Sequence, residues 1–515
     1  MAPATSAVKG VPLLANVRGR RLLALERDQW SGMAESMKAG GAGLLALWGT
    51  DDRDRDGRFR VHAAYLLPGE VVLVEHPLSP GDESYPSLAP LFPVAGRLER
   101  AVADLLGLRA EGGDGRGWLR HGGWPETVFP LRRDSAATGN FPRSSVAYPF
   151  VAVTGDGVHE IPVGPVHAGI IEPGNFRFSV VGEKVLRLEQ RLGYTHKGVA
   201  KRFEQLSQQD GHRLAARLSG DSAVAFSWAY CAALETLTGT AVPPRAAALR
   251  ALALERERIA NHLGDLGALG NDAGFGLGLA QFSRLKEDLL RANAAALDAR
   301  YLLDLVVPGG VASDIGRESR NALIQQLVPL QTAVVELRTL YDEHPGLQDR
   351  FRDAGRLDRA LAEKLGAVGL AARASGIQRD LRRDLPWPPY DALDPKVVVQ
   401  STGDVAARVQ VRFGELLESI RLSRALLEGL PEGAVRVEIP FAPGDRLGLG
   451  AIEGWRGPVL IALHTGAEGT IRRCHAHDPS WQNWPLLEHA ILDNIVPDFP
   501  LINKSFNLSY SGHDG

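Results

Sequence analysis

The spacing of hydrophobic residues changes near residue 150 and separates two kinds of sequence. Before that point, short apolar runs at 43–48 and 69–74 predict strands, and the spacing over 98–106 predicts a helix. After residue 183, apolar positions recur every three or four residues between Gly, Pro, Asn and Asp signals, which is typical of amphipathic helices. The predicted helices span 183–218, 220–238, 244–268, 279–305, 315–343, 356–374 and 402–428.

Strands are predicted on both sides of the helical region. Alternation over 158–181, with turn signals at Pro165, Gly169, Pro173 and Gly174, predicts a β-hairpin. Further strands are predicted at 434–439 and 458–464, followed by a helix near 484–492. Gly444, Gly448 and Gly450 lack the lysine and following helix of a phosphate-binding loop, so we interpret them as turn glycines.

This order of elements predicts an α+β fold with three parts. Residues 1–140 form a small α/β domain, 141–157 a linker, and 158–515 a mainly helical core with small β elements. The chain has 515 residues, of which 44% are hydrophobic and 23% charged, as in soluble globular proteins. We therefore expect large cores and no extensive disorder.

Charge and cysteine content narrow the functional classes. The 58 Lys and Arg residues nearly balance 61 Asp and Glu residues, and a net charge of -3 does not favour a nucleic-acid partner. The only cysteines, Cys231 and Cys474, exclude a disulfide framework and a four-thiolate metal site, so we expect core thiols in a reducing compartment. Residues 1–25 predict no signal peptide, and Glu235 within the apolar stretch 223–242 favours a buried helix over a membrane span.

Several polar residues allow more than one interpretation. His167, Glu172, Asn175 and Arg177 share one turn-rich segment, which either presents hydrogen-bonding groups to a cleft or satisfies its own backbone. The three-residue spacing of Glu255 and Arg258 favours a structural ion pair over a proton relay. His475 and His477 alternate on a strand without a third ligand nearby, so we expect solvated histidines and no metal site.

Four motifs in residues 158–515 together resemble a known family. They are LEQRLGYTHKG at 188–198, LERERIANHL at 254–263, GDVAAR at 403–408 and EGWRG at 453–457. This combination resembles the large subunit of membrane-bound NiFe hydrogenases of the formate hydrogenlyase type, a family homologous to the quinone-site large subunit of respiratory complex I. The resemblance implies a hydrogenase-large-subunit-like fold for this region.

The N-terminal unit is similar to the small hydrophilic subunit that pairs with the large subunit in complex I. The similarity lies in Glu99-Arg100, in DLLG at 104–107, in Trp124-Pro125 and in FPLRRD at 129–134. The resemblance therefore implies that two complex I-type subunits are fused in one chain.

The same family holds nickel and iron with two CxxC pairs, one early and one near the C-terminus. On this chain the four positions fall at Ser219, Ser222, Ser509 and Gly512. A neutral hydroxyl is a poor ligand for a soft metal, and glycine has no side chain to offer. We therefore expect no metal and no hydrogenase activity.

The complex I relatives imply an electron-transfer role, with a quinone as the candidate bound molecule. A histidine and an aspartate of the family pattern fall at Asn175 and Asp272, and Asn175 cannot deliver a proton as an imidazolium does. Ala200 stands where the family usually has a glutamate after the His-Lys-Gly turn. Glu204 could replace that glutamate in a proton route, but we prefer to interpret it as a solvated surface residue. The expected cavity is lined by His167, Asn175, Arg177, Ser219, Ser222, Ser509 and His513, with Asp221 and Asp272 handling protons.

The resemblance also implies an assembly. No cofactor is expected on this chain; a 4Fe-4S cluster belongs to an iron-sulfur small subunit, and membrane subunits carry the ion channel. The chain would lie at the cytoplasmic face of the membrane as a peripheral subunit of a complex I-like oxidoreductase that couples electron transfer to ion translocation. The alternative is a non-catalytic scaffold between a soluble redox module and a membrane ion-translocating arm.

Overall fold

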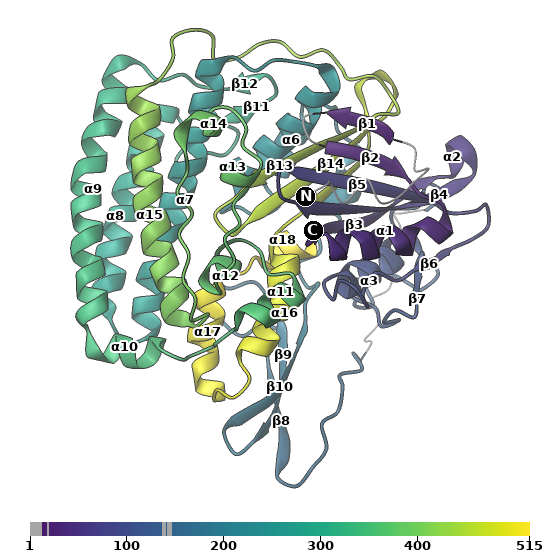
Figure 1. Ribbon diagram of the computed structural model, residues 1–515, viewed down its shortest axis with the longest axis horizontal. Helices are drawn as coiled ribbons and strands as arrows, with labels where there is room; N and C mark the ends of the chain where they lie inside the picture. Colours follow the sequence, from purple (N-terminus) through teal and green to yellow (C-terminus); the bar gives the residue numbers. More distant parts are fainter. Residues whose placement is uncertain (1–12, 18–19, 136–140, 142–146) are drawn as a thin grey trace.

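The computed structural model consists of an N-terminal α/β unit, a protruding three-stranded sheet, and a helical core with a second sheet (Figure 1). It describes residues 13–17, 20–135, 141 and 147–515. The mixed α+β fold predicted from the sequence is confirmed. The predicted linker at 141–157 falls partly outside the described residues.

A five-stranded sheet in the order β1-β2-β5-β4-β3 forms the centre of the N-terminal unit. Strands β2 and β5 pair in parallel and the other neighbours are antiparallel. The predicted strands at 43–48 and 69–74 are confirmed as β3 and β5, and the helix at 98–106 as α3. The elements are β1 Leu13–Val17, β2 Arg20–Ala24, α1 Arg27–Ala39, β3 Gly43–Asp52, α2 Arg53–Asp56, β4 Arg58–Leu67, β5 Glu70–Pro77, β6 Ser84–Pro86, α3 Ala95–Leu106 and β7 Arg109–Glu111.

The protruding sheet contains β8 (Val158–Val163), β9 (Asn175–Val181) and β10 (Lys184–Arg191), which lie together at the lower edge of Figure 1. The predicted hairpin at 158–181 is confirmed, whereas the helix predicted over 183–218 is wrong. Val185 and Leu188 of β10 lie opposite Val180 and Phe178 of β9, so strand pairing overrides the helical spacing. Only two short helices follow, α4 Val199–Phe203 and α5 Gly211–Ala215.

Long helices α7, α8, α9 and α15 stand side by side on one flank of the molecule (Figure 1). The apolar faces predicted from the sequence pack against one another there. The predicted helix at 356–374 is interrupted, because Gly366 ends α11 in a left-handed conformation. The elements are α6 Ala223–Thr238, α7 Pro244–Asp272, α8 Gly276–Leu297, β11 Val306–Val307, β12 Gly310–Val311, α9 Arg317–Glu343, α10 Pro345–Phe351, α11 Arg359–Leu365, α12 Gly369–Ala374, α13 Leu381–Asp384, α14 Tyr390–Leu393 and α15 Val405–Glu428.

The C-terminal region adds an antiparallel sheet in the order β13-β14-β15, which packs on α6. The predicted strand at 458–464 and helix near 484–492 are confirmed, but 434–439 is not a strand. Gly448 and Gly450 are not turn glycines: they lie within β13, and a Cβ on Gly450 would stand 1.8 Å from the carbonyl oxygen of Ala229 in α6. The elements are β13 Leu447–Glu453, β14 Pro458–Thr465, a 3-10 turn at Ala467–Gly469, β15 Ile471–His477, α16 Ser480–Ala490, a 3-10 turn at Val496–Asp498, α17 Phe499–Phe506 and α18 Tyr510–Asp514.

The N-terminal unit and the core share a packed interface. Trp48 of β3 stacks between His62 of β4 and His475 of β15, with ring centroids 5.1 and 4.7 Å away. His477 is fully buried and shares a 2.9 Å hydrogen bond with Gln482. The prediction of solvated strand histidines is therefore wrong, because the N-terminal sheet covers β15. Burial lowers the pKa of His477 to about 4.

Among the described helices, none combines the length and the apolar character needed to cross a membrane. Cys231 and Cys474 are both buried, as predicted for core thiols, and burial raises the pKa of each thiol.

Candidate functional site

The four positions that correspond to the hydrogenase cysteines converge in the folded chain. Ser219 and Ser222 lie in the turn that leads into α6, while Ser509 caps α18 and Gly512 lies in its first turn. The Ser219 and Ser509 hydroxyls share a 2.8 Å hydrogen bond, although 290 residues separate them. The backbone N–H of Gly512 donates to the Ser509 hydroxyl at 2.9 Å. The early and the late pair of positions therefore lie together in one site, as the resemblance implies.

An ion pair lies next to Ser219 and Ser222. The two terminal nitrogens of Arg456 donate to the two carboxylate oxygens of Asp221 at 2.6 and 2.5 Å. Ser219 also donates to Asp221 at 2.8 Å, and the Arg456 guanidinium stacks 4.0 Å from the ring centroid of Trp455. Burial raises the pKa of Asp221, but the charge and hydrogen bonds of Arg456 outweigh it and the pKa is lowered. Asp221 is therefore ionised near neutral pH.

We call Ser219, Asp221, Ser222, Arg456 and Ser509 the site cluster. It is continuous with α7 and α15 through Asn507, whose carbonyl accepts from Arg456 at 2.5 Å and whose amide donates to Asp265 at 2.6 Å. The other oxygen of Asp265 accepts from Arg412 at 2.8 Å. Buried charges of opposite sign thus alternate outward from the site cluster.

Asp478 closes the site cluster on the side of Gly512. A Cβ at Gly512 would stand 2.5 Å from one carboxylate oxygen of Asp478 and 2.8 Å from the Ser509 hydroxyl. Asp478 is buried, and that same oxygen has no hydrogen-bond partner among the described residues. Burial raises its pKa. Position 512 therefore has no room for a side chain in this arrangement.

A second carboxyl group lies next to Asp221. Glu257 of α7 accepts from the backbone N–H of Val224 at 2.7 Å and of Ala225 at 3.3 Å, at the start of α6. Glu257, Asp221 and Asn261 line a cavity of about 260 Å³. Burial, with a smaller contribution from the charge of Asp221, raises the pKa of Glu257 to about 8. Glu257 is therefore largely protonated at neutral pH and Asp221 is not.

The hairpin loop before β9 packs against α18. His167 Nε2 lies 3.2 Å from the Tyr510 hydroxyl, and Glu172 accepts from the backbone N–H of Ser511 at 2.9 Å. Asn175 begins β9, and its side-chain oxygen is buried without a hydrogen-bond partner among the described residues. Arg177 points elsewhere and pairs with Glu160 at 2.8 Å. The hairpin therefore brings His167 beside the helix that carries Ser509, whereas Arg177 is already paired.

Two predicted site residues lie apart from the site cluster. His513 is fully buried, stacks 3.9 Å from Trp481 and shares a 2.8 Å hydrogen bond with Asp514. Asp272 is exposed at the end of α7, where its electrostatic partners are Asn271 and Lys504. No contact among the described residues joins Asp272 to the site cluster.

The predicted ion pair between Glu255 and Arg258 is confirmed, with 3.6 Å between charged atoms and both side chains fully buried. Glu255 also accepts from Arg382 at 3.0 Å and from Ser419 at 2.6 Å, so it belongs to a structural network. The prediction that Glu204 is a solvated surface residue is wrong, because its side chain is only 11% exposed and accepts from Lys201 at 2.9 Å.

Comparison with known proteins identifies the chain. It is 32% identical to formate hydrogenlyase subunit 5 of Escherichia coli (strain K12) over 92% of this chain and 85% of that protein. The chain belongs to the formate hydrogenlyase subunit 5 family. It is also 30% identical to hydrogenase-4 component G of the same organism, over 92% and 83% of the two chains. An NADH-quinone oxidoreductase subunit from Chloroherpeton thalassium is 31% identical over 67% and 84%.

Two family models match parts of the chain, and one solved structure shares its fold. Residues 23–141 match the 30 Kd subunit of respiratory-chain NADH dehydrogenase and residues 272–446 match its 49 Kd subunit. The fold is similar to a chain of a membrane-bound sulfane sulfur reductase, an archaeal respiratory membrane complex, with a TM-score of 0.66, 24% identity, and coverage of 70% and 99%. The resemblance inferred from the motifs is confirmed, and the relatives are subunits of complex I-like and hydrogenase-related membrane complexes.

Sequence reasoning missed three residues in or next to the site cluster. Arg456 lay within the EGWRG motif, which marked the family but assigned the arginine no role. Glu257 lay likewise within LERERIANHL. Asp478 stands out in the sequence only beside His475 and His477, and only the fold places it against Gly512.

Proposed function

We propose that this chain is the large subunit of a complex I-like membrane oxidoreductase and takes part in electron transfer without a nickel–iron centre. The observation that carries the proposal is the site cluster itself. Hydroxyls replace the soft thiolates that such a centre needs at three of the four positions, and the Arg456 cation pairs with Asp221 beside them. These residues do not fit a nickel–iron centre.

The assembly would follow that of the relatives. Partners of this chain would be an iron-sulfur small subunit with a 4Fe-4S cluster and membrane subunits that translocate ions, with the chain at the cytoplasmic face. A quinone is the candidate electron acceptor, because one relative is named as part of an NADH-quinone oxidoreductase. The face formed by His167, Asn175 and α18 is the candidate surface for its headgroup, since hydrogen-bond donors there suit quinone carbonyls.

Glu257 is the strongest candidate for proton handling in this proposal. It retains its proton near neutral pH and shares a cavity with Asp221, whereas Asp221 is held ionised by Arg456. A group with a pKa near the working pH is suited to proton transfer. Asp272, the alternative candidate, is exposed and lies apart from the site cluster.

The test begins with elemental analysis of the intact complex purified from membranes. We expect iron in cluster amounts and no nickel, followed by reduction of a soluble quinone analogue. The variant Glu257→Gln should slow quinone reduction, while Glu336→Gln, at an exposed position of α9, should not. Stoichiometric nickel or hydrogen evolution would contradict the proposal.

A scaffold without redox chemistry is the second candidate. Two observations favour it. Arg456 binds both carboxylate oxygens of Asp221, and the residue at the start of β9 is Asn175, whose amide cannot deliver a proton. The scaffold predicts that the intact complex reduces no quinone and that a quinone analogue does not protect His167 from chemical labelling.

A further inference from the structure

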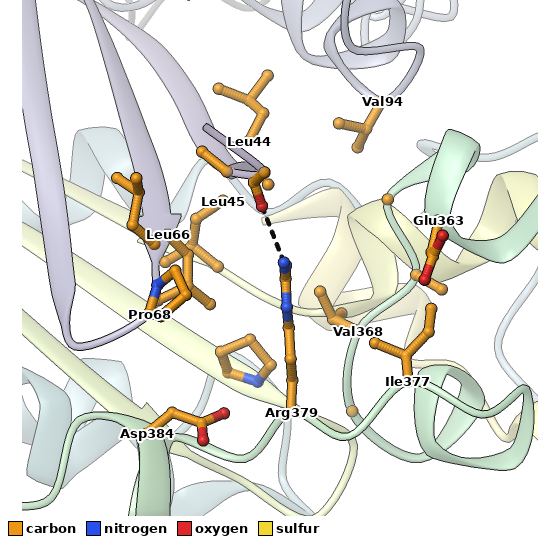
Figure 2. A pocket seen from close by; sticks show the side chains of 18 of the residues that line it. Leu44, Leu45, Leu66, Pro68, Val94, Glu363, Val368, Ile377, Arg379 and Asp384 are labelled. Carbon is orange, nitrogen blue, oxygen red and sulfur yellow. Dashed lines mark hydrogen bonds between the residues drawn. The ribbon is translucent and has the colours of Figure 1, made fainter. Parts of the chain in front are cut away.

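A cavity of about 620 Å³ lies between the N-terminal unit and the core, and its lining includes no residue of the site cluster (Figure 2). One wall comes from the start of β3 and the end of β4. The turn before α3 and the segments around α11, α12 and α13 complete it. This volume is within the range of small-molecule binding sites, which often lie between domains.

The walls of this interdomain cavity are largely apolar. Leu44 and Leu66 from the N-terminal sheet face Val368 and Ile377 from the core, with Val94 at one end (Figure 2). Such a surface favours the apolar body of a ligand.

Positive charge in the interdomain cavity is not balanced by neighbouring acids. Arg379 extends across it and donates to the carbonyl oxygen of Gly41 at 2.9 Å (Figure 2). Lys38 and Lys364 also line it, and among the described residues no ion pair includes Arg379, Lys38 or Lys364. Lys38 lies 5.2 Å from the centroid of the Phe92 ring and Arg379 donates to Gly41, but neither contact neutralises the charge, so all three cations can still attract an anion.

The other charges around the interdomain cavity are already paired. Arg359 pairs with Glu363 at 2.8 Å and Arg383 with Asp384 at 2.6 Å. The buried carboxylate of Glu453 accepts from Arg373 at 2.9 Å. The unpaired charge is therefore positive, and it is carried by Arg379, Lys38 and Lys364.

We propose that the interdomain cavity binds a small amphipathic anion, with an apolar body against Leu44, Leu66 and Val368 and a phosphate or carboxylate head on Arg379. An anionic head suits a guanidinium that keeps unused N–H donors after its single bond to Gly41. Because Arg379 belongs to the core and Gly41 to the N-terminal unit, the ligand would bind both units at once. This site is independent of the proposed electron-transfer role.

The test uses the full chain or its purified complex and isothermal titration calorimetry. Octyl phosphate and octanoate should bind saturably, one per chain. Octyltrimethylammonium has the same tail and the opposite charge, and inorganic phosphate has the head alone; both should bind at least about tenfold more weakly, given the strength of a charge-assisted hydrogen bond. Vesicles that contain phosphatidylglycerol distinguish the source: binding to vesicles indicates a lipid, and binding only to octyl phosphate a soluble molecule.

Variants distinguish binding in the interdomain cavity from nonspecific attraction to positive charge on the surface. Arg379→Gln should weaken octyl phosphate binding by about tenfold or more, whereas Arg284→Gln, a 58% exposed arginine of α8, should leave it unchanged. If Arg379→Gln does not fold, the double variant Lys38→Gln and Lys364→Gln, at two exposed positions, tests the same positive charge and should also weaken octyl phosphate binding. Equal binding of octyltrimethylammonium, equal binding of inorganic phosphate, or equal loss in Arg284→Gln would each overturn the proposal.

Discussion

Replacement of Asp221 by asparagine tests the central ion pair of the site cluster. Removal of one partner from a buried ion pair costs about 3–5 kcal/mol, because the other charge stays buried without compensation. Arg456 is only 5% exposed, but the Asp221 side chain is 38% exposed, so water can compensate part of the loss. We therefore expect Asp221→Asn to lower the free energy of unfolding by ~3 kcal/mol, at the lower end of that range.

A double-mutant cycle isolates the pair. Arg456→Met should cost a similar amount, and the double variant should cost less than the sum of the two, with a coupling of ~2 kcal/mol. Urea unfolding followed by tryptophan fluorescence suits this measurement, since Trp455 stacks on Arg456. Additive losses would refute the reasoning, because they would mean that Asp221 and Arg456 do not stabilise each other.

Three further predictions concern single positions. The folded-state pKa of Glu257 is raised to about 8 from an ordinary value of 4.5, so the wild type should lose stability relative to Glu257→Gln as the pH rises from 4.5 to 8. Urea midpoints of both proteins over a pH series measure this loss of stability. A difference in midpoint that does not change with pH would contradict the prediction. Gly512→Ala should destabilise the protein by ~1–3 kcal/mol, because its Cβ would meet the carboxylate of Asp478; an unchanged melting temperature would count against the close approach. Gly450→Ala should destabilise by at least a similar ~1–3 kcal/mol, since its Cβ would meet the backbone of α6, and thermal unfolding of this variant beside Gly276→Ala, where a Cβ meets nothing within 4 Å, provides the comparison.

Most long helices could be predicted because their apolar spacing reflects the faces they bury. The spans 244–268, 315–343 and 402–428 correspond to α7, α9 and α15 with shifts of at most four residues at the ends. The span 279–305 corresponds to α8, but that helix ends eight residues earlier, at Leu297. Segment 183–218 could not be assigned in this way. Strand β10 within it is defined by its pairing with β9, a tertiary contact that overrides local spacing.

The serines of the site cluster, which precede α6 and α18, could be proposed from the resemblance, whereas the chemistry of the site cluster could not. No local pattern indicates that Arg456 binds Asp221, since 235 residues separate them. The same holds for the burial of His477, which results from the N-terminal sheet packing over β15. Long-range packing therefore determines the electrostatics of the site, and the spacing of residues along the sequence does not reveal which residues pack together.

The hydrogen bond between Ser219 and Ser509 has a consequence for biosynthesis. Translation proceeds at about 5–20 residues per second, so the segment with Ser219 leaves the ribosome well before its partner is made. During that interval Asp221 lacks Arg456, and the turn before α6 has no α18 to contact. A chain at this stage should bind chaperones, and chaperone co-precipitation after pulse labelling should detect binding that ends once residue 509 has left the ribosome and met Ser219.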